Sequence, residues 1–193
     1  VVDCGVAMTP TVGVVVQRLD AAGGLVVTAS HNPGEWNGLK PITALGGAPA
    51  PDEGQTIIDA FGSGDAPAAW ATSEGVGRLR TDRSSHEFHV QRVLQEVGQL
   101  IDLETIRNNK FKVVVDSVNA SGTLGARWLL EELGCQVVHL NNDDSGVFPH
   151  TPEPTRENLV DLCDAVRKAD ASVGFAQDPD ADRLALIDTD GTY

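Results

Sequence analysis

A serine, a histidine and a lysine lie on one polar loop directly after an apolar segment. Ser30, His31 and Lys40 fall within residues 28–40, and the apolar residues 25–28 predict a short buried strand before them. Ligands of open α/β sheets bind beyond the carboxyl ends of the strands, which makes Ser30 the candidate reacting group. The loop also holds Asn-Pro and Asn-Gly turn pairs, so a plain connection is the alternative. It lacks the Gly-x-Ser-x-Gly turn of α/β-hydrolases, which disfavours an acyl-transfer triad.

Three aspartates alternate along a second polar loop. Asp178, Asp180 and Asp182 follow an apolar segment, and a curved loop with this spacing can turn three carboxylates toward one point. Such carboxylates repel one another unless a cation lies between them, and their oxygens suit a hard divalent ion. A solvated acidic turn is the alternative. A calcium-binding EF-hand is excluded, because the sixth residue from Asp178 is Arg183 rather than Gly and the twelfth is Thr189 rather than Glu.

Both loops match motifs of one enzyme family. The segment Thr-Ala-Ser-His-Asn-Pro at residues 28–33, with Asn-Gly-Leu-Lys at 37–40, closely resembles the phosphoserine loop of the α-D-phosphohexomutases. This family includes phosphoglucomutase, phosphomannomutase and phosphoglucosamine mutase. The segment Asp-Pro-Asp-Ala-Asp-Arg at residues 178–183 resembles the family's magnesium-binding loop. Two motifs in the expected order make the resemblance specific.

The resemblance implies a phosphoryl-transfer chemistry centred on Ser30. In this family the serine carries a phosphate, gives its phosphoryl group to a hexose or hexosamine phosphate, and takes back the other phosphate of the bisphosphate intermediate. The net result is a 1,6 phosphate shift. Asp178, Asp180 and Asp182 would bind Mg²⁺, with phosphorylated Ser30 as a further ligand. The two loops must therefore meet across one cleft.

Three more residues of the motifs receive roles by the same resemblance. Lys40 lies in the active site of this family, where it and His31 would exchange a proton with the sugar hydroxyl or stabilise charge. Arg183 would bind a phosphate with bidentate geometry. A surface salt bridge is the alternative for Arg183.

The resemblance also implies the fold class, which is α/β with two three-layer α/β/α domains whose sheets are mixed and mostly parallel, truncated at both ends. We expect residues 1–108 to form domain I without its first strand, and residues 109–193 to form an incomplete domain II. The family's domains III and IV hold the loop that selects the sugar and a phosphate clamp. We therefore expect no mutase activity from this chain alone. On overall similarity, phosphoglucosamine mutase or phosphomannomutase is favoured over a dedicated phosphoglucomutase.

The elements that position the first loop follow from local patterns. We expect a strand at residues 1–3, a helix with Thr9 as N-cap that Gly23-Gly24 ends, the strand before Ser30, and a helix capped by Asp52. The strand-helix-strand order predicts a βαβ unit whose loops share one sheet edge. Residues 62–77 predict an irregular surface loop, and residues 85–100 predict an amphipathic helix.

The second half predicts strands at residues 111–116, 135–140, 172–176 and 184–188, a helix over 124–133, and a helix capped by Thr155. The polar residues 107–110 predict the boundary between the domains. The Ser/Gly loop at 117–122 has no P-loop pattern and is interpreted as a plain turn rather than an anion site. His86 and His89 are interpreted as structural, because a zinc site needs further ligands.

Composition limits the possible partners. The 193 residues carry a net charge of −14 with a pI near 4.5, which argues against nucleic acid, since its phosphates are bound by Lys and Arg. Three scattered cysteines predict reduced thiols in a cytoplasmic protein, and the sequence shows neither a signal peptide nor an apolar run that would span a membrane. The expected ligands are a hexose or hexosamine phosphate and Mg²⁺.

Two other functions are compatible with these residues. An aspartate-nucleophile phosphatase would attack phosphate with Asp178 or Asp180 on the loop after the strand at residues 172–176. A sugar-phosphate-binding module without catalysis would keep both loops and lack the chemistry.

Overall fold

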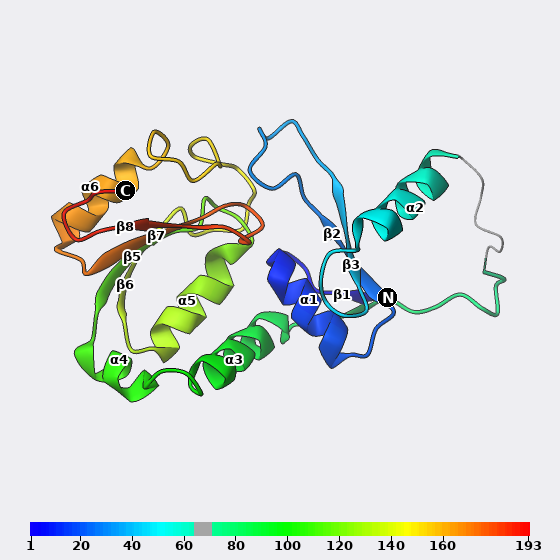
Figure 1. Ribbon diagram of the computed structural model, residues 1–193, viewed down its shortest axis with the longest axis horizontal. Coiled ribbons are helices and arrows are strands. Elements are labelled where there is room, and N and C mark those ends of the chain that lie inside the picture. Colours follow the sequence, from blue (N-terminus) through cyan, green and yellow to red (C-terminus); the bar gives the residue numbers. More distant parts are fainter. Residues whose placement is uncertain (64–70) are drawn as a thin grey trace.

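The computed structural model describes residues 1–63 and 71–193 as two α/β regions that lie side by side (Figure 1). Region 1, the described part of residues 1–84, contains β1 (Val2–Asp3), α1 (Thr9–Arg18), β2 (Gly23–Val27), β3 (Leu39–Thr43), α2 (Pro51–Gly62) and β4 (Arg80–Thr81). Helices α3 (Ser85–Val97) and α4 (Leu103–Asn109) follow. Region 2, residues 110–193, contains β5 (Lys112–Asp116), α5 (Gly122–Glu132), β6 (Gln136–Leu140), α6 (Val160–Ala169), β7 (Val173–Gln177) and β8 (Leu184–Ile187).

Region 2 is a sheet between two helices. Its four strands lie in the order β6-β5-β7-β8, with β5 parallel to β6 and β7 and with β8 antiparallel to β7. Successive side chains of a strand point to opposite faces, so Val113 and Val115 pack with Leu130 of α5, whereas Val114 packs with Leu162 of α6. The predicted three-layer α/β/α arrangement with a mixed sheet is therefore confirmed here.

Region 1 contains two separate pairs of strands. β1 pairs parallel with β4, and β2 pairs antiparallel with β3. Helix α1 packs on the second pair through a cluster of Val16, Val26 and Ile42. The predicted βαβ unit is present as the sequence of elements β1, α1 and β2. Within the described residues, however, β1 and β2 pair with different strands and not with each other. An open cavity of about 1500 Å³ lies between β1, α1 and β2 and extends to Ser30 and Asp180.

Helix α3 joins the two regions, because it packs against α1 on one side and α5 on the other (Figure 1). His86 contacts Trp128 of α5 edge to face with 6.2 Å between ring centroids, and its Nε2 lies 2.9 Å from the carbonyl oxygen of Val6. His89 instead faces Thr11 of α1, with 2.8 Å between Nδ1 and Oγ1. Each histidine thus has its own structural partner at this junction.

Three predicted helix caps are wrong. Helix α1 has Met8 at its N-cap, α2 has Ala50 and α6 has Leu159, in place of Thr9, Asp52 and Thr155. Gly23 and Gly24 begin β2 rather than ending α1, whose C-cap is Leu19. For Thr9 the physical reason is that its hydroxyl bonds to Asp180, far along the chain, and makes no capping bond within α1.

The strand before Ser30 is also less buried than predicted. In β2 only Val26 is buried, while Leu25 and Val27 lie on the face turned away from α1 and are 58% and 65% exposed. The surface loop predicted over residues 62–77 falls partly on residues 64–70, outside the described residues. In the part of the chain that the structure describes, no helix is both long and apolar enough to cross a bilayer.

Candidate active site

Ser30 lies at the end of β2 and reaches across to region 2. Its backbone has a φ of 53°, in the left-handed region, and its N–H donates to the Thr28 hydroxyl at 2.9 Å. This turn directs the Ser30 hydroxyl toward the acidic loop, where it donates to Asp178 Oδ2 at 2.8 Å. The two loops are separated by 148 residues in sequence, and the structure brings them into direct contact.

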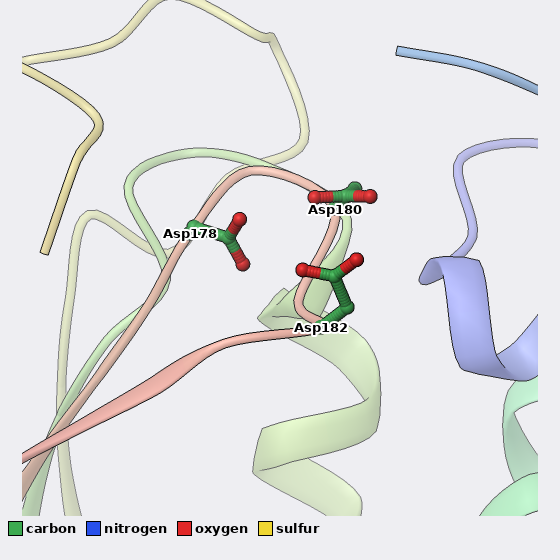
Figure 2. Close-up of side chains that lie close together, drawn as sticks. All are labelled: Asp178, Asp180 and Asp182. Carbon is green, nitrogen blue, oxygen red and sulfur yellow. The ribbon is translucent and has the colours of Figure 1, made fainter. Parts of the chain in front are cut away.

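The acidic loop follows β7 and gathers its three carboxylates around one space (Figure 2). One oxygen from each of Asp178, Asp180 and Asp182 lies within 4.8 Å of the others. Ala181 has a φ of 53°, and its N–H donates to the Asp178 carbonyl at 2.9 Å, which closes a tight turn. The N–H of Arg183 donates to Asp178 Oδ1 at 3.1 Å. The predicted convergence of the alternating aspartates is therefore present.

Lys40 on β3 supplies a positive charge to this cluster. Its Nζ lies 2.5 Å from Asp180 Oδ2 and 3.0 Å from Asp182 Oδ2. The strand pairing of β2 with β3 places Lys40 opposite Val26, so the serine loop and the lysine belong to one hairpin. Region 1 thus presents a hydroxyl and an ammonium group to the three carboxylates of region 2.

Burial and pairing shift the acidities of these groups in different directions. Burial raises the pKa of Asp178 above its ordinary value, although its bonds with Ser30 and the Arg183 N–H oppose the shift. For Asp180, burial is the largest influence, but hydrogen bonds from Lys40, Thr9 and Ser30 outweigh it and lower the pKa. Burial alone would lower the pKa of Lys40. Its hydrogen bonds to Asp180 and Asp182 outweigh burial and raise the pKa above its ordinary value. Lys40 is therefore held as an ammonium ion.

Two parts of the chain match models of known protein domains. Residues 1–68 match α/β/α domain I of phosphoglucomutase/phosphomannomutase, and residues 89–191 match α/β/α domain II. The chain belongs to the phosphoglucomutase/phosphomannomutase family. The resemblance that the two loop motifs carry is thus confirmed over nearly the whole sequence.

Individual members of the phosphoglucomutase/phosphomannomutase family agree with this placement. A phosphoglucomutase/phosphomannomutase of Thermococcus kodakarensis and a probable phosphoglucosamine mutase of Methanopyrus kandleri are each 36% identical over 100% of this chain and 41% of their own length. The solved structure of a family protein from Burkholderia thailandensis superposes with a TM-score of 0.73 at 30% identity, over 99% of this chain and 40% of that one. The chain therefore spans about 40% of the length of these relatives.

His31 and Arg183 occupy different positions in the site of this family member. The His31 Nδ1 lies 3.3 Å from the Ser30 hydroxyl, and its ring is partly exposed. Arg183 contributes its backbone N–H to the acidic loop, while the residue itself is exposed. The structure thus places His31 beside Ser30 and leaves the Arg183 guanidinium at the solvent side of the loop.

The donor set fits a hard divalent cation. Asp178 and Asp180 are 0% and 2% exposed, and Asp180 Oδ1 is buried with no hydrogen-bond partner. A buried carboxylate oxygen without a partner is costly, and a cation among the three carboxylates would satisfy it. Lys40 supplies one positive charge against three carboxylates, which leaves negative charge for a cation to neutralise. Oxygen donors of this kind are those that Mg²⁺ prefers.

Two residues of the site escaped the sequence reasoning. Thr9 at the start of α1 donates from Oγ1 to Asp180 Oδ2 at 2.6 Å and from its N–H to the Asp180 carbonyl at 2.9 Å. Ser121 at the start of α5 donates from Oγ to the Pro179 carbonyl at 2.7 Å and from its N–H at 3.2 Å. Their types and places before helices were visible in the sequence, but those signals indicate capping and do not indicate a partner.

Proposed function

We propose that the full-length protein is a phosphohexomutase that moves a phosphoryl group between positions 1 and 6 of a hexose or hexosamine phosphate through a phosphoserine at Ser30. The single observation that supports this proposal is the 2.8 Å bond from the Ser30 hydroxyl to Asp178. It joins a serine to a cluster of three carboxylates that suits a cation. Phosphoryl transfer needs in-line positioning and neutralised charge, and these are the two things that this arrangement offers.

In this proposal Asp178, Asp180 and Asp182 hold Mg²⁺, which when bound would neutralise charge on phosphate oxygens. The oxygen of a sugar hydroxyl attacks the phosphorus carried on Ser30, the bond from phosphorus to the Ser30 Oγ breaks, and Ser30 regains its hydroxyl when the proton is returned. The reverse transfer then takes the second phosphate of the bisphosphate onto Ser30. Atoms and charges balance over the two transfers, so no co-reactant is consumed.

In this proposal Lys40 stabilises negative charge and His31 transfers a proton. Because its pKa is raised, Lys40 stays protonated and stabilises negative charge on the transferred group and the carboxylates. His31, with Nδ1 beside Ser30, exchanges the proton of the attacking or leaving hydroxyl. Arg183, exposed at the solvent side, binds the phosphate that is not being transferred.

The substrate class follows from the relatives named above, which are phosphoglucomutase/phosphomannomutase and phosphoglucosamine mutase proteins. We infer a hexose or hexosamine phosphate, turned over in the cytoplasm. Because the relatives are much longer than this chain, we infer that two further domains complete the active site. The boundary between domains I and II at residues 108 and 109 is part of the same proposal.

The test is Ser30→Ala in the full-length protein, with Ser172→Ala as a matched control. Ser172 is exposed and lies just before β7, at the opposite end of that strand from Asp178. We expect Ser30→Ala to lower turnover by about 10³-fold or more while the melting temperature stays near wild type, and Ser172→Ala to leave both unchanged. Near-normal turnover without the Ser30 hydroxyl would exclude the proposal.

Mass spectrometry of the isolated protein distinguishes the other candidate functions. Phosphate on the peptide that contains Ser30 supports the mutase. Phosphate trapped on Asp178 or Asp180 instead would support an aspartate-nucleophile phosphatase. Tight binding of a hexose phosphate with neither residue phosphorylated and no turnover would support a binding module.

A further inference from the structure

The peptide units of the acidic loop are held from both regions by the starts of two helices. From region 2, Ser121 at the N-cap of α5 donates twice to the carbonyl of Pro179, at 2.7 Å from Oγ and 3.2 Å from N–H. From region 1, Thr9 at the start of α1 donates its N–H to the carbonyl of Asp180 at 2.9 Å. Two neighbouring carbonyls of one loop are thus fixed by different regions.

Thr9 makes one contact that Ser121 does not. Its hydroxyl donates to the side chain of Asp180, at 2.6 Å from Oδ2, and so shares that oxygen with Lys40. The hydroxyl makes no capping bond within α1. With Oδ2 fixed in this way, Asp180 Oδ1 is left buried and without a partner. Figure 2 shows Asp180 at the turn of the loop, on the side that faces the start of α1.

We propose that Thr9 is a positioning residue of the metal site, which orients the Asp180 carboxylate so that its second oxygen is available to the cation. This inference rests on the proposed function, because it requires the three aspartates to bind a metal. Residues that hydrogen-bond metal ligands fix the orientation of those ligands and raise their affinity for the metal, commonly by 10-fold or more. Thr9 acts in this way from the other region of the molecule.

The position of Thr9 makes the metal site depend on the contact between the regions. Its neighbour Met8 is buried, and the end of the Met8 side chain occupies the space that a Cβ on Gly125 of α5 would take. The start of α1 is therefore held against α5 by Met8 while it holds Asp180 through Thr9. Separation of the two regions would remove the hydroxyl from Asp180 and weaken cation binding without any change in the three ligands.

The experiment compares Mn²⁺ affinity among variants of the full-length protein, measured by electron paramagnetic resonance with Mn²⁺ as a visible substitute for Mg²⁺. Thr9→Val keeps the β-branched shape and the backbone N–H but removes the hydroxyl, and Thr9→Ser restores it. Thr11→Val is the matched control, because it removes a buried hydroxyl bond of the same helix, to His89, that does not touch the acidic loop.

We expect Thr9→Val to raise the Kd for Mn²⁺ about 10-fold and Thr9→Ser to return it close to wild type. Thr11→Val should lower the melting temperature while the Kd stays unchanged. An unchanged Kd for Thr9→Val, with wild type binding Mn²⁺, would overturn the role of Thr9 and leave the proposed function standing. Failure of wild type to bind Mn²⁺ would overturn the metal site, and the role of Thr9 with it.

Discussion

In region 2, the side chains of Val114, Leu162 and Ile187 are fully buried between the sheet and α6, whereas in region 1 Leu25 and Val27 of β2 are more than half exposed. A continuous four-stranded sheet covered by helices on both faces buries apolar side chains on each face within region 2 itself. In region 1, helix α1 forms only a small cluster with the strand pair β2–β3, and the pair β1–β4 is separate from it. Of the two regions, region 2 thus has the more completely buried core.

Region 1 contributes to the same site through bonds rather than through its own core. Ser30, Lys40 and Thr9 all have hydrogen bonds to the acidic loop of region 2. Their geometry therefore depends on the contact between the regions as much as on the local fold of region 1.

The largest effect that tests this comparison is the loss of a core side chain from each region. Leu162→Ala in region 2 removes a fully buried side chain and should lower the free energy of unfolding by about 2–5 kcal/mol. Leu25→Ala in region 1 removes a side chain that is 58% exposed and should change it by less than about 0.5 kcal/mol. Urea unfolding followed by circular dichroism measures both. Equal losses would show that β2 is packed more tightly than the structure indicates.

A smaller effect tests the contact between the regions. Lys40→Met leaves the carboxylates of Asp180 and Asp182 without their cation, and should lower the free energy of unfolding by about 2 kcal/mol in the absence of metal. Mg²⁺ should then raise the melting temperature of Lys40→Met by more than that of wild type, because a cation would relieve the same repulsion. Lys168→Met, an equal charge change on the exposed end of α6, is the control. An equal response to Mg²⁺ in both variants would show that Lys40 does not balance this cluster.

The smallest effect concerns two histidines whose contributions to the free energy of unfolding change with pH in opposite directions. The hydrogen bond to Asp116 raises the pKa of His150 in region 2, so its stabilisation is complete below its ordinary value of 6.5 and is lost as the pH rises through the raised value. Burial lowers the pKa of His89, which packs on region 1 through Thr11, so its stabilisation is present above 6.5 and is lost as the pH falls below it.

A separate variant of each histidine measures its contribution to the pH dependence of stability. We expect His150→Gln to flatten the decline of the urea midpoint above pH 6.5, and His89→Gln to flatten its decline below pH 6.5. Each change should correspond to about 1 kcal/mol or less in the free energy of unfolding. The measurement is the urea midpoint from pH 5 to pH 8. A variant that changes the midpoint equally at every pH would show that its histidine contributes packing and not a shifted proton equilibrium.

Local patterns predicted most of region 2 because its elements carry strong and continuous signals. The strand at residues 111–116 appears as Lys112–Asp116, and that at 172–176 as Val173–Gln177. A run of valines flanked by polar turns leaves few other structures open. The meeting of Ser30 with the three aspartates was also predicted, but through the resemblance, because nothing local relates two loops so far apart in sequence.

Long-range contacts explain what the sequence could not show. Thr9 has the type and place of an N-cap, yet its hydroxyl bonds to Asp180, and the cap falls on Met8. The exposure of Leu25 and Val27 was missed for the same reason, since an apolar run looks alike whether one face or two are covered. Such residues have ordinary local signals and acquire their roles only from partners elsewhere in the fold.

The left-handed backbone of Ser30 has an energetic consequence. A side chain on a residue with φ of 53° costs roughly 1 kcal/mol relative to glycine, which adopts this conformation freely. Replacement of Ser30 by glycine would therefore relieve local strain while removing the oxygen that the proposed chemistry requires. The turn that directs the Ser30 hydroxyl to Asp178 thus carries a local conformational cost, which the contacts between the two loops offset.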